Sequence, residues 1–460
     1  MNAPDNSVEN FMASLPEELR PQECLGPIHG GQHQQRRQSL AAWIAQHGGG
    51  VVVLSAGEEV LRNRDNPFPF RSHSDFLYMT GFPEPDAWLV MRVDANGDTR
   101  SILACRPRDA EREIWDGMRI GPERAAERFH VDEAIDLQQL DATVIKMAAN
   151  LPAFYAHVGM HAELDERLRH WLNALRAQGR AGVTAPDRIV DISLAIAKQR
   201  LIKDSFEIDT MQRAADISAA AHVRAMKFAH PGQHEYALEA ELLHGFRAGG
   251  AQSVAYGSIV ASGPHSCILH HRAGDRVIRD GELILIDAGC ELDGYAADIT
   301  RTFPANGKFT PQQRAIYDVV QAAQHEAIDA TKVGGAFTAP HDAAVRALVR
   351  GMLDLELIPK QSVDSAIESG DYKRFYMHRT GHWLGLDVHD VGDYNTPLTE
   401  GMVLTIEPGF YIRPAADIDP GFWNIGIRIE DDALVTKHGP RLLTRGVPVD
   451  ADAIEALMKE

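Results

Sequence analysis

The sequence lacks the features that place a protein in several special classes. Its 460 residues include only four cysteines (Cys24, Cys105, Cys267 and Cys290), and none of them forms a CxxC pair. Disulfide frameworks need denser cysteines, so we expect reduced thiols and a cytoplasmic protein. Residues 1–10 include acidic residues but no basic or apolar run, and they are therefore typical of neither a signal peptide nor a transit peptide.

Long apolar runs and an excess of positive charge are also missing. No stretch approaches the roughly 18 apolar residues of a membrane helix, so we expect no membrane partner. Lys and Arg number 46 against 65 Asp and Glu, which gives a formal net charge of −19. Such a chain is not expected to bind nucleic acid through bulk charge. Its hydrophobic share of 44% nevertheless suffices for ordinary globular cores and excludes a wholly disordered chain.

What is present indicates two domains. Helical and strand-like runs alternate in the first part of the chain: a helix at 36–46, strands at 51–54, 87–93 and 101–105, and a helix at 162–177. This alternation predicts an α/β domain over residues 1–190. A helix-forming run over 192–229 marks the joint. Residues 191–460 hold short strands separated by glycines and predict an α+β domain with an antiparallel sheet, which includes helices starting at 311 and 341.

Two aspartates flank a predicted hairpin in the second domain. A buried strand ends at Asp287, and Asp293-Gly294 follows as a two-residue hairpin signal. If those two residues form the loop, Asp287 opposes Thr300. Asp298 then lies diagonally from Asp287 on the same face, with Cα atoms roughly 7–8 Å apart. The alternative is a pair of solvent-facing aspartates beside a turn. On a buried face the two charges would repel, and a bound cation would remove that repulsion.

The segment 378–389 contains three histidines, His378, His382 and His389, with two glycines between them. The glycines predict a loop or irregular strand whose backbone packs closely. Imidazole is both a common metal ligand and a proton shuttle near neutral pH. The alternative is a set of core histidines that hydrogen-bond to the backbone. His270, which follows a short apolar run, is a weaker candidate when taken alone.

Two glutamates also follow or interrupt apolar strands. Glu407 comes directly after the strand 403–406, and Arg428 and Glu430 alternate with apolar residues, so both point to one face. The alternative for Arg428 and Glu430 is a surface ion pair. Four carboxylates with one imidazole suit Mn²⁺, Co²⁺ or Zn²⁺. Two such ions can share and activate a water and clamp a carbonyl, which indicates amide hydrolysis.

In this order these motifs resemble the pita-bread metallopeptidases, and within them the bacterial aminopeptidase P (Xaa-Pro aminopeptidase) branch. The resemblance runs through most of residues 200–435. It is carried by the segments 285–290, 298–304, 382–392 and 426–432, together with 74–82 near the N-terminus.

The resemblance implies a creatinase-like N-terminal domain and a pita-bread catalytic domain with a curved, mainly antiparallel sheet. It implies hydrolysis of the bond between an N-terminal residue and a following proline, by a hydroxide bridging two divalent metals. Mn²⁺ is the cofactor we expect, with Co²⁺ or Zn²⁺ as alternatives. Peptides with proline in the second position are the expected partners, and the chain is expected to form a homo-oligomer, either a dimer or a tetramer.

The resemblance also assigns individual residues. The implied metal ligands are Asp287, Asp298, His382, Glu407 and Glu430. The implied catalytic residues are His270, His378, His389, Glu407 and Arg428. The implied substrate-binding residues are Tyr411, Asp65 and Trp115, of which Asp65 is expected to reach a neighbouring subunit's site.

Two departures and two alternatives accompany this interpretation. Arg379 stands where relatives often have Gly, and His271 stands where a Tyr is frequent, so both bear on substrate preference. A prolidase restricted to Xaa-Pro dipeptides shares all five metal ligands and differs only in what blocks the far side of the cleft. A non-catalytic pita-bread binding module, or a metal-free creatine hydrolase, is disfavoured because all five ligands are present.

Overall fold

Residues 30–160 and 162–460 are described by the computed structural model, which divides into two units, Met1–Gln199 and Arg200–Glu460. The expected domain division lies at 190/191, nine residues before this one. Cys24 and the expectation for residues 1–10 lie outside the described residues. Over the described ranges, no helix combines the length and apolar character that crossing a membrane requires.

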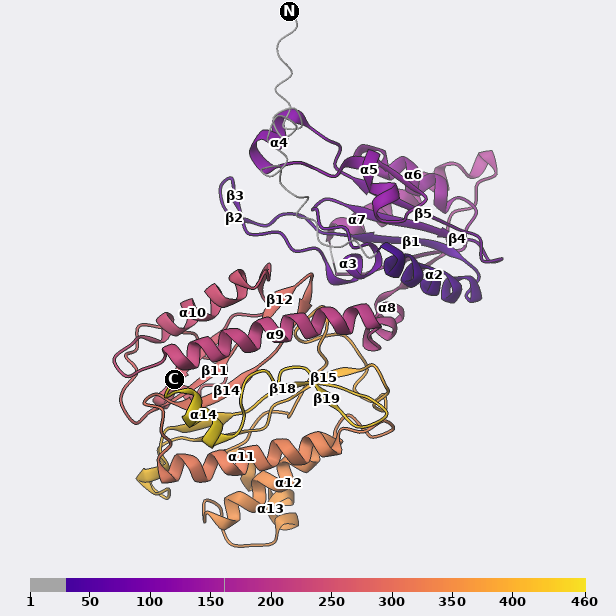
Figure 1. The fold of residues 1–460 in the computed structure, drawn as a ribbon. Helices are drawn as coiled ribbons and strands as arrows, with labels where there is room; N and C mark the ends of the chain where they lie inside the picture. Colours follow the sequence, from indigo (N-terminus) through magenta and orange to yellow (C-terminus); the bar gives the residue numbers. More distant parts are fainter. Residues whose placement is uncertain (1–29, 161) are drawn as a thin grey trace, which may run out of the picture. The chain divides into compact units, whose positions relative to one another are not determined.

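The N-terminal unit is built on one mixed sheet of six strands in the order β6-β5-β4-β1-β7-β8 (Figure 1). The strands are β1 (Gly50–Ser55), β4 (Trp88–Val93), β5 (Thr99–Cys105), β6 (Glu133–Asp136), β7 (Ala153–Ala156) and β8 (Arg188–Asp191), and β2 (Leu61–Asn63) pairs separately with β3 (Asn66–Pro67). The helices are α2 (Gly30–Gln46), α3 (Ser74–Thr80), α4 (Ala110–Asp116), α5 (Gly121–Arg128), α6 (Leu140–Ala148) and α7 (Ala162–Ala177). This confirms the α/β prediction.

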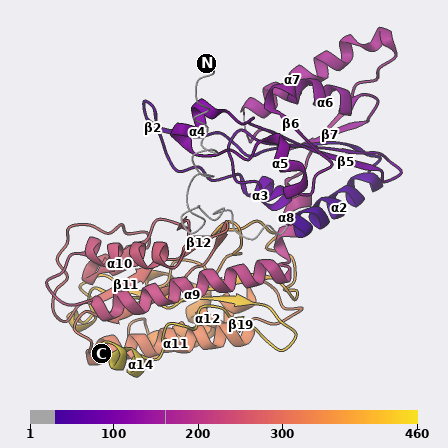
Figure 2. The ribbon, with the colours of Figure 1, turned by 45° about the horizontal axis from the view of Figure 1, so that its top comes forward.

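The core of this unit explains its layering. The run 51–54 is completely buried in β1 because helices cover both faces of the sheet. Val51 and Val53 face one side, where they pack with Val144 of α6 and Trp171 of α7. Figure 2 shows α2 on the opposite side of the sheet from α6 and α7.

The helix-forming run over 192–229 is not one helix. It forms two helices, α8 (Ser193–Leu201) and α9 (Ser205–Phe228). Asp204 caps α9: its side chain accepts from the Glu207 backbone N–H, and the Glu207 side chain accepts from the Asp204 N–H. This reciprocal capping box starts a new helix, because it satisfies backbone donors that a continuous helix would have bonded internally.

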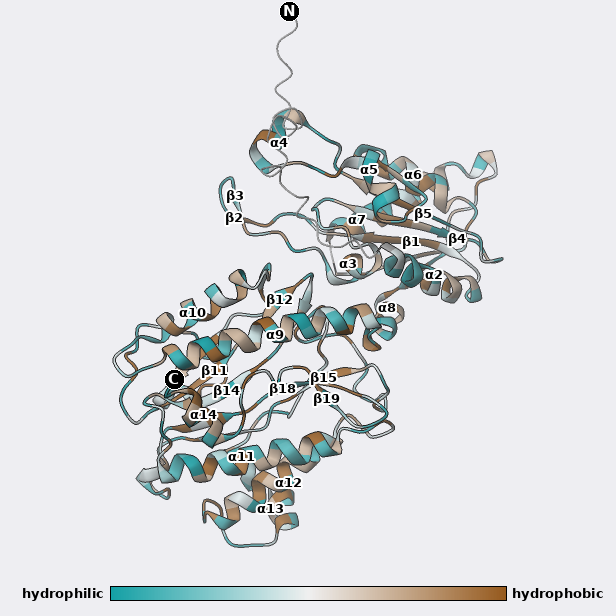
Figure 3. Cartoon of the chain, viewed as in Figure 1, coloured by the Kyte–Doolittle hydropathy of each residue, from teal (hydrophilic) through white to brown (hydrophobic). Residues whose placement is uncertain are grey.

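The C-terminal unit consists of short antiparallel sheets covered by long helices (Figure 1). Its strands are β9 (Ser253–Val254), β10 (Ile259–Ser262), β11 (Leu283–Asp287), β12 (Cys290–Leu292), β13 (Tyr295–Ala296), β14 (Thr300–Pro304), β15 (Val403–Ile406), β16 (Gly409–Ile412), β17 (Ile425–Arg428), β18 (Asp431–Leu434) and β19 (Arg441–Leu442). Its helices after α9 are α10 (Glu235–Ala248), α11 (Pro311–Ala330), α12 (Ala339–Asp354), α13 (Val363–Ser369) and α14 (Ala451–Leu457). In Figure 3, α9 and α11 carry both hydrophilic and hydrophobic colours, as helices with one face on a core do.

The predicted hairpin is confirmed in register. Asp287 pairs with Thr300, and Leu292 pairs with Tyr295. Asp293 and its neighbour Gly294 both have positive φ (50° and 85°). A two-residue hairpin loop with a type I′ turn requires this combination. Two aspartates eleven positions apart in sequence are thereby brought to one face of a buried ribbon.

Candidate active site

The predicted site residues gather around one cavity of about 670 Å³ in the C-terminal unit. Nine of them line it: His270, Asp287, Asp298, His378, His382, His389, Glu407, Arg428 and Glu430. Tyr411 is buried beside the cavity and hydrogen-bonds to two of these residues. Residues from six separate segments of the chain therefore meet in one place.

Three of the four carboxylates lie at or beside the ends of short strands. Asp287 is the last residue of β11, Glu407 follows β15, and Glu430 lies between β17 and β18. Glu430 is anchored to β14, because Thr300 donates to its Oε2 at 2.6 Å and accepts from its backbone N–H at 3.1 Å. The apolar strand residues bury the backbone, and their ends present the acids to the cavity.

His382 joins the acids through its Nε2 atom. That atom lies 3.5 Å from Asp298 Oδ2 and 3.8 Å from Glu407 Oε1. Nδ1 of the same ring donates to the Trp383 carbonyl at 2.9 Å, which orients Nε2 toward the carboxylates, where it could bind a cation. Asp298, His382 and Glu430 each offer one ligand atom, and these atoms all lie within 4.8 Å of one another.

The loop that carries His382 packs as its glycines predict. A Cβ on Gly381 would collide with the Thr405 carbonyl oxygen, and one on Gly385 would collide with the Asp390 carboxylate. The segment forms no regular strand and is tied to β15 by the isolated bridge between Trp383 and Leu404. The close approach allows the histidine to reach acids that follow and precede it in the chain.

The electrostatics of the acids favour a bound cation. Burial raises the pKa of Asp298, and the charge of Asp287 raises it further. Burial likewise raises the pKa of Glu407 to about 7 and the pKa of Glu430 well above its ordinary value. Burial alone would lower the pKa of His382, but its contacts with Asp298 and Glu407 raise that pKa to about 9. Like charges that are crowded together and buried in this way are stabilised by divalent cations.

Arg428 organises the other side of the cavity. Its guanidinium donates to Asp287 Oδ2 at 2.5 Å and to the Tyr411 hydroxyl at 3.0 Å. That hydroxyl lies 2.8 Å from His378 Nε2. Arg428 and Glu430 are 3% and 1% exposed, which excludes the alternative of a surface ion pair. Burial, followed by the charge of Arg428, lowers the pKa of His378 to about 3, so this imidazole is neutral.

His389 is a second neutral imidazole at the cavity. Burial lowers its pKa, and the charges of His382 and His270 lower it further. Its ring contacts the His382 ring edge to face, with centroids 4.3 Å apart. The cavity therefore offers two neutral histidines beside the carboxylate cluster.

Sequence reasoning missed Tyr256, which lines the same cavity. Its hydroxyl lies 2.5 Å from Asp287 Oδ1 and also contacts Asp298 Oδ1. It lies between β9 and β10, in a short irregular segment with no pattern of its own. The only sequence signal is an aromatic residue beside Gly257, and such pairs are common in loops.

Asp65 and Trp115 belong to the N-terminal unit. Asp65 is exposed in the turn between β2 and β3, and Trp115 in α4 is 83% exposed. Their assignment to substrate binding remains a prediction.

Comparisons with known proteins match both units. Residues 209–437 match the metallopeptidase family M24, and residues 33–155 match the aminopeptidase P N-terminal domain. The Xaa-Pro aminopeptidase of Escherichia coli (strain K12) is 41% identical over 438 residues, covering 94% of this chain and 99% of that protein. The chain belongs to metallopeptidase family M24. Its M24 match is confined to the C-terminal unit, which contains the cavity.

Solved structures agree with this family assignment. Aminopeptidase PepP of Pseudomonas aeruginosa has a TM-score of 0.91 and 43% identity, and covers 94% of this chain and 98% of that chain. A zinc-substituted aminopeptidase P of E. coli, solved with a product, has a TM-score of 0.90 and 40% identity over 94% of this chain and 98% of that chain. The fold is therefore a creatinase-like N-terminal domain followed by a pita-bread domain, as the motifs imply.

Proposed function

We propose that this chain is a metal-dependent aminopeptidase that hydrolyses the bond between an N-terminal residue and a following proline. The observation that carries the proposal is the convergence of four carboxylates and one imidazole on one cavity of an M24 chain. The E. coli and Haemophilus influenzae relatives, at 41% and 39% identity, both carry the name Xaa-Pro aminopeptidase and are covered to 99% of their lengths.

The donor set fits two divalent cations. Asp287, Asp298, His382, Glu407 and Glu430 would hold them, and the four carboxylates would balance their charge. Oxygen donors with a single nitrogen favour Mn²⁺, with Co²⁺ or Zn²⁺ as alternatives. When bound, the cations would supply Lewis-acid activation of water and of the scissile carbonyl.

The remaining residues would hold the substrate and move protons. Glu407, whose pKa burial raises to about 7, can accept and release a proton near neutral pH. His389 is a neutral imidazole that would donate to the substrate carbonyl as negative charge develops on its oxygen. His378 would line the substrate site, and its single N–H donates from Nδ1 to the Arg379 carbonyl at 2.7 Å. Arg428 would brace Asp287, and Tyr411 would orient His378 through the 2.8 Å contact between its hydroxyl and Nε2.

The cavity wall suits proline. An Xaa-Pro bond is a tertiary amide without an N–H, so strand-like recognition of the peptide fails at that position. Ile259, Leu269 and Val388 line the cavity together with His270 and give the pyrrolidine ring apolar surface beside the carboxylate cluster. We place the proline side chain against these residues.

The assembly and setting of the chain complete the proposal. We propose a homo-oligomer, a dimer or a tetramer, in which Asp65 reaches a neighbouring subunit's site; light scattering on purified protein measures its mass.

We also propose a cytoplasmic setting, because Cys105, Cys267 and Cys290 are buried free thiols, and burial raises their pKa values to about 11 or 12.

A peptide panel on metal-loaded enzyme tests the function. We expect turnover of Xaa-Pro-Yaa tripeptides and longer peptides, and none of matched peptides with alanine in place of proline. Cleavage confined to the Xaa-Pro dipeptide would identify a prolidase instead. Full metal loading without cleavage of any peptide would favour a binding module.

A further inference from the structure

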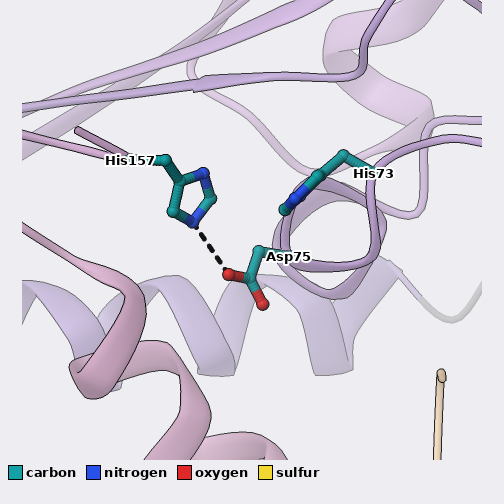
Figure 4. A group of neighbouring side chains, drawn as sticks. All are labelled: His73, Asp75 and His157. Atoms are coloured by element: carbon teal, nitrogen blue, oxygen red, sulfur yellow. Dashed lines mark hydrogen bonds and ion pairs between the residues drawn. The ribbon is translucent and has the colours of Figure 1, made fainter. Parts of the chain in front are cut away.

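A second group of metal-ligating side chains lies in the N-terminal unit, within a part of the chain that the proposed function does not use. His73 directly precedes α3, Asp75 lies in the first turn of that helix, and His157 follows β7. Figure 4 shows the two imidazoles approaching Asp75 from two sides. Asp75 and His157 are 5% and 2% exposed, so the group is built into the unit rather than displayed on its surface.

The distances suit a single small ion. His157 Nε2 lies 2.8 Å from Asp75 Oδ2, and the His73 and His157 ring centroids are 4.9 Å apart. One ligand atom from each of the three residues lies within 4.8 Å of the other two. Donor atoms bound tetrahedrally to one zinc lie about 3.3 Å apart, given bond lengths of about 2.0–2.2 Å. Side-chain adjustments of roughly an ångström would therefore close the group around an ion.

A hydrogen-bonded Asp75–His157 pair alone is the competing explanation. It accounts for two of the three residues but not for a second imidazole whose ring nitrogen lies within 4.8 Å of the same carboxylate. A sulfur atom is also present, because Met160 Sδ lies 3.2 Å from His73 Nε2. Two nitrogens, one oxygen and a neighbouring thioether form a donor set for a borderline transition metal and not for Mg²⁺ or Ca²⁺.

We propose that His73, Asp75 and His157 bind one Zn²⁺ ion that ties the start of α3 to the end of β7. The ion links segments 82 residues apart in sequence, from Asp75 to His157. Its role is structural: it holds α3 against the sheet of the N-terminal unit, independently of the metals proposed for the cavity. The ion would enter from the side of His73 and Met160. Met160 is half exposed and His73 is the least buried ligand, whereas Asp75 and His157 are buried.

Metal counting on the full chain tests this site. Purified protein is dialysed against buffered Zn²⁺, and zinc per chain is measured by mass spectrometry for wild type and His73→Ala. His73 is the least buried of the three ligands, so its truncation leaves the Asp75–His157 hydrogen bond in place. We expect His73→Ala to bind one equivalent less than wild type. Equal counts in the two proteins would overturn the proposal.

Two further variants sharpen the result. His170→Ala, exposed on α7 of the same unit, is the matched control and should keep the wild-type count. Asp75→Asn keeps the side-chain shape and should also lose one equivalent, which covers the case in which His73→Ala does not fold. Because all variants retain the cavity residues, the difference of one equivalent holds whatever the cavity binds. The experiment therefore tests the zinc site of the N-terminal unit separately from the proposed peptidase function.

A stability measurement gives an independent readout. An ion that binds only the folded unit raises the melting temperature as its concentration rises. Wild type and His170→Ala should show a component of the zinc-dependent shift that His73→Ala lacks. An identical zinc response in all three proteins would also overturn the site.

Discussion

The hydroxyl of Tyr256 lies 2.5 Å from Asp287 Oδ1 and at the same time contacts Asp298. Burial, followed by the charges of the two aspartates, raises the pKa of Tyr256 well above its ordinary value. The phenol therefore stays protonated and acts as a donor. One residue outside every recognised motif thus holds two proposed metal ligands at a shared position.

Replacing Tyr256 with Phe tests this role. The ring keeps its packing, but both carboxylates lose the hydroxyl that contacts them. Groups that orient metal ligands typically contribute 10–100-fold to metal affinity or activity, and we expect a loss of about this size. Metal titration followed by peptide hydrolysis measures it. Tyr236→Phe, at a half-exposed tyrosine on α10, is the control, and equal metal affinity in both variants would contradict the prediction.

Removing Glu430 should abolish metal loading and activity together. Glu430 is 1% exposed and its carboxylate accepts from Thr300, so its removal takes one proposed ligand from a buried site. We expect Glu430→Ala to purify with little metal and to show no peptide turnover. Glu400→Ala, which breaks an exposed ion pair with Lys437, should behave as wild type. A fully active, metal-poor Glu430→Ala enzyme would refute the two-metal proposal.

Asp390 holds the histidine loop through buried charges. Its carboxylate contacts Arg200 and lies 3.1 Å from Lys203 Nζ, and these side chains are at most 3% exposed. Asp390→Ala leaves Lys203 buried without that carboxylate, which we expect to cost about 3–5 kcal/mol. Urea unfolding measures the loss. Asp364→Ala, at an exposed pair with Arg346, should cost at most about 1 kcal/mol. A similar cost for both would show that the buried cations find water or other partners.

His222 makes stability depend on pH. Burial lowers its pKa from 6.5 to about 4, against an opposing effect of its hydrogen bond to Ala288 and with smaller contributions from the charges of Arg301 and Asp287. Its Nε2 donates to the Ala288 carbonyl at 2.9 Å. As pH falls below 6.5 the unfolded chain takes up a proton at His222, and the folded chain does not until about pH 4. The free energy of unfolding therefore falls across this window.

The variant His222→Gln isolates this contribution. Glutamine keeps a donor near the Ala288 carbonyl but does not titrate. We expect the free energy of unfolding of wild type to fall by roughly 2–3 kcal/mol more than that of the variant when the pH is lowered from about 7.5 to about 4.5. Comparing the two proteins by urea unfolding at each pH cancels the effect of metal loss in acid. A difference that stays constant with pH would contradict the prediction.

Local patterns predicted those parts of the fold that depend on local physics. The pairing of Asp287 with Thr300 followed from a two-residue loop and a side-chain period of two, because together they leave a single register. Over 192–229 the composition indicated helix, but it did not indicate where one helix ends and the next begins. There the capping box of Asp204 and Glu207 breaks the helix, and its backbone bonds outweigh propensity.

The candidate site divides in the same way. Asp287, Glu407 and Glu430 were visible in sequence because each ends or interrupts an apolar strand. Tyr256 and Thr300 were not, because hydroxyl groups in loops and strands are common and carry no pattern. His73 and His157 lie 84 positions apart, and nothing in the sequence between them connects the two.

The sequence by itself determined the acids at strand ends, the hairpin register and the family, since each depends on neighbours along the chain. The tertiary structure decided which hydroxyls, guanidinium and imidazoles meet those acids, and it brought a second histidine–aspartate group together in the N-terminal unit. The physical reason is that contacts between distant segments depend on how the sheets and helices pack. That packing buries Arg428, Tyr256 and Asp298 in one site, where burial and neighbouring charges shift their pKa values.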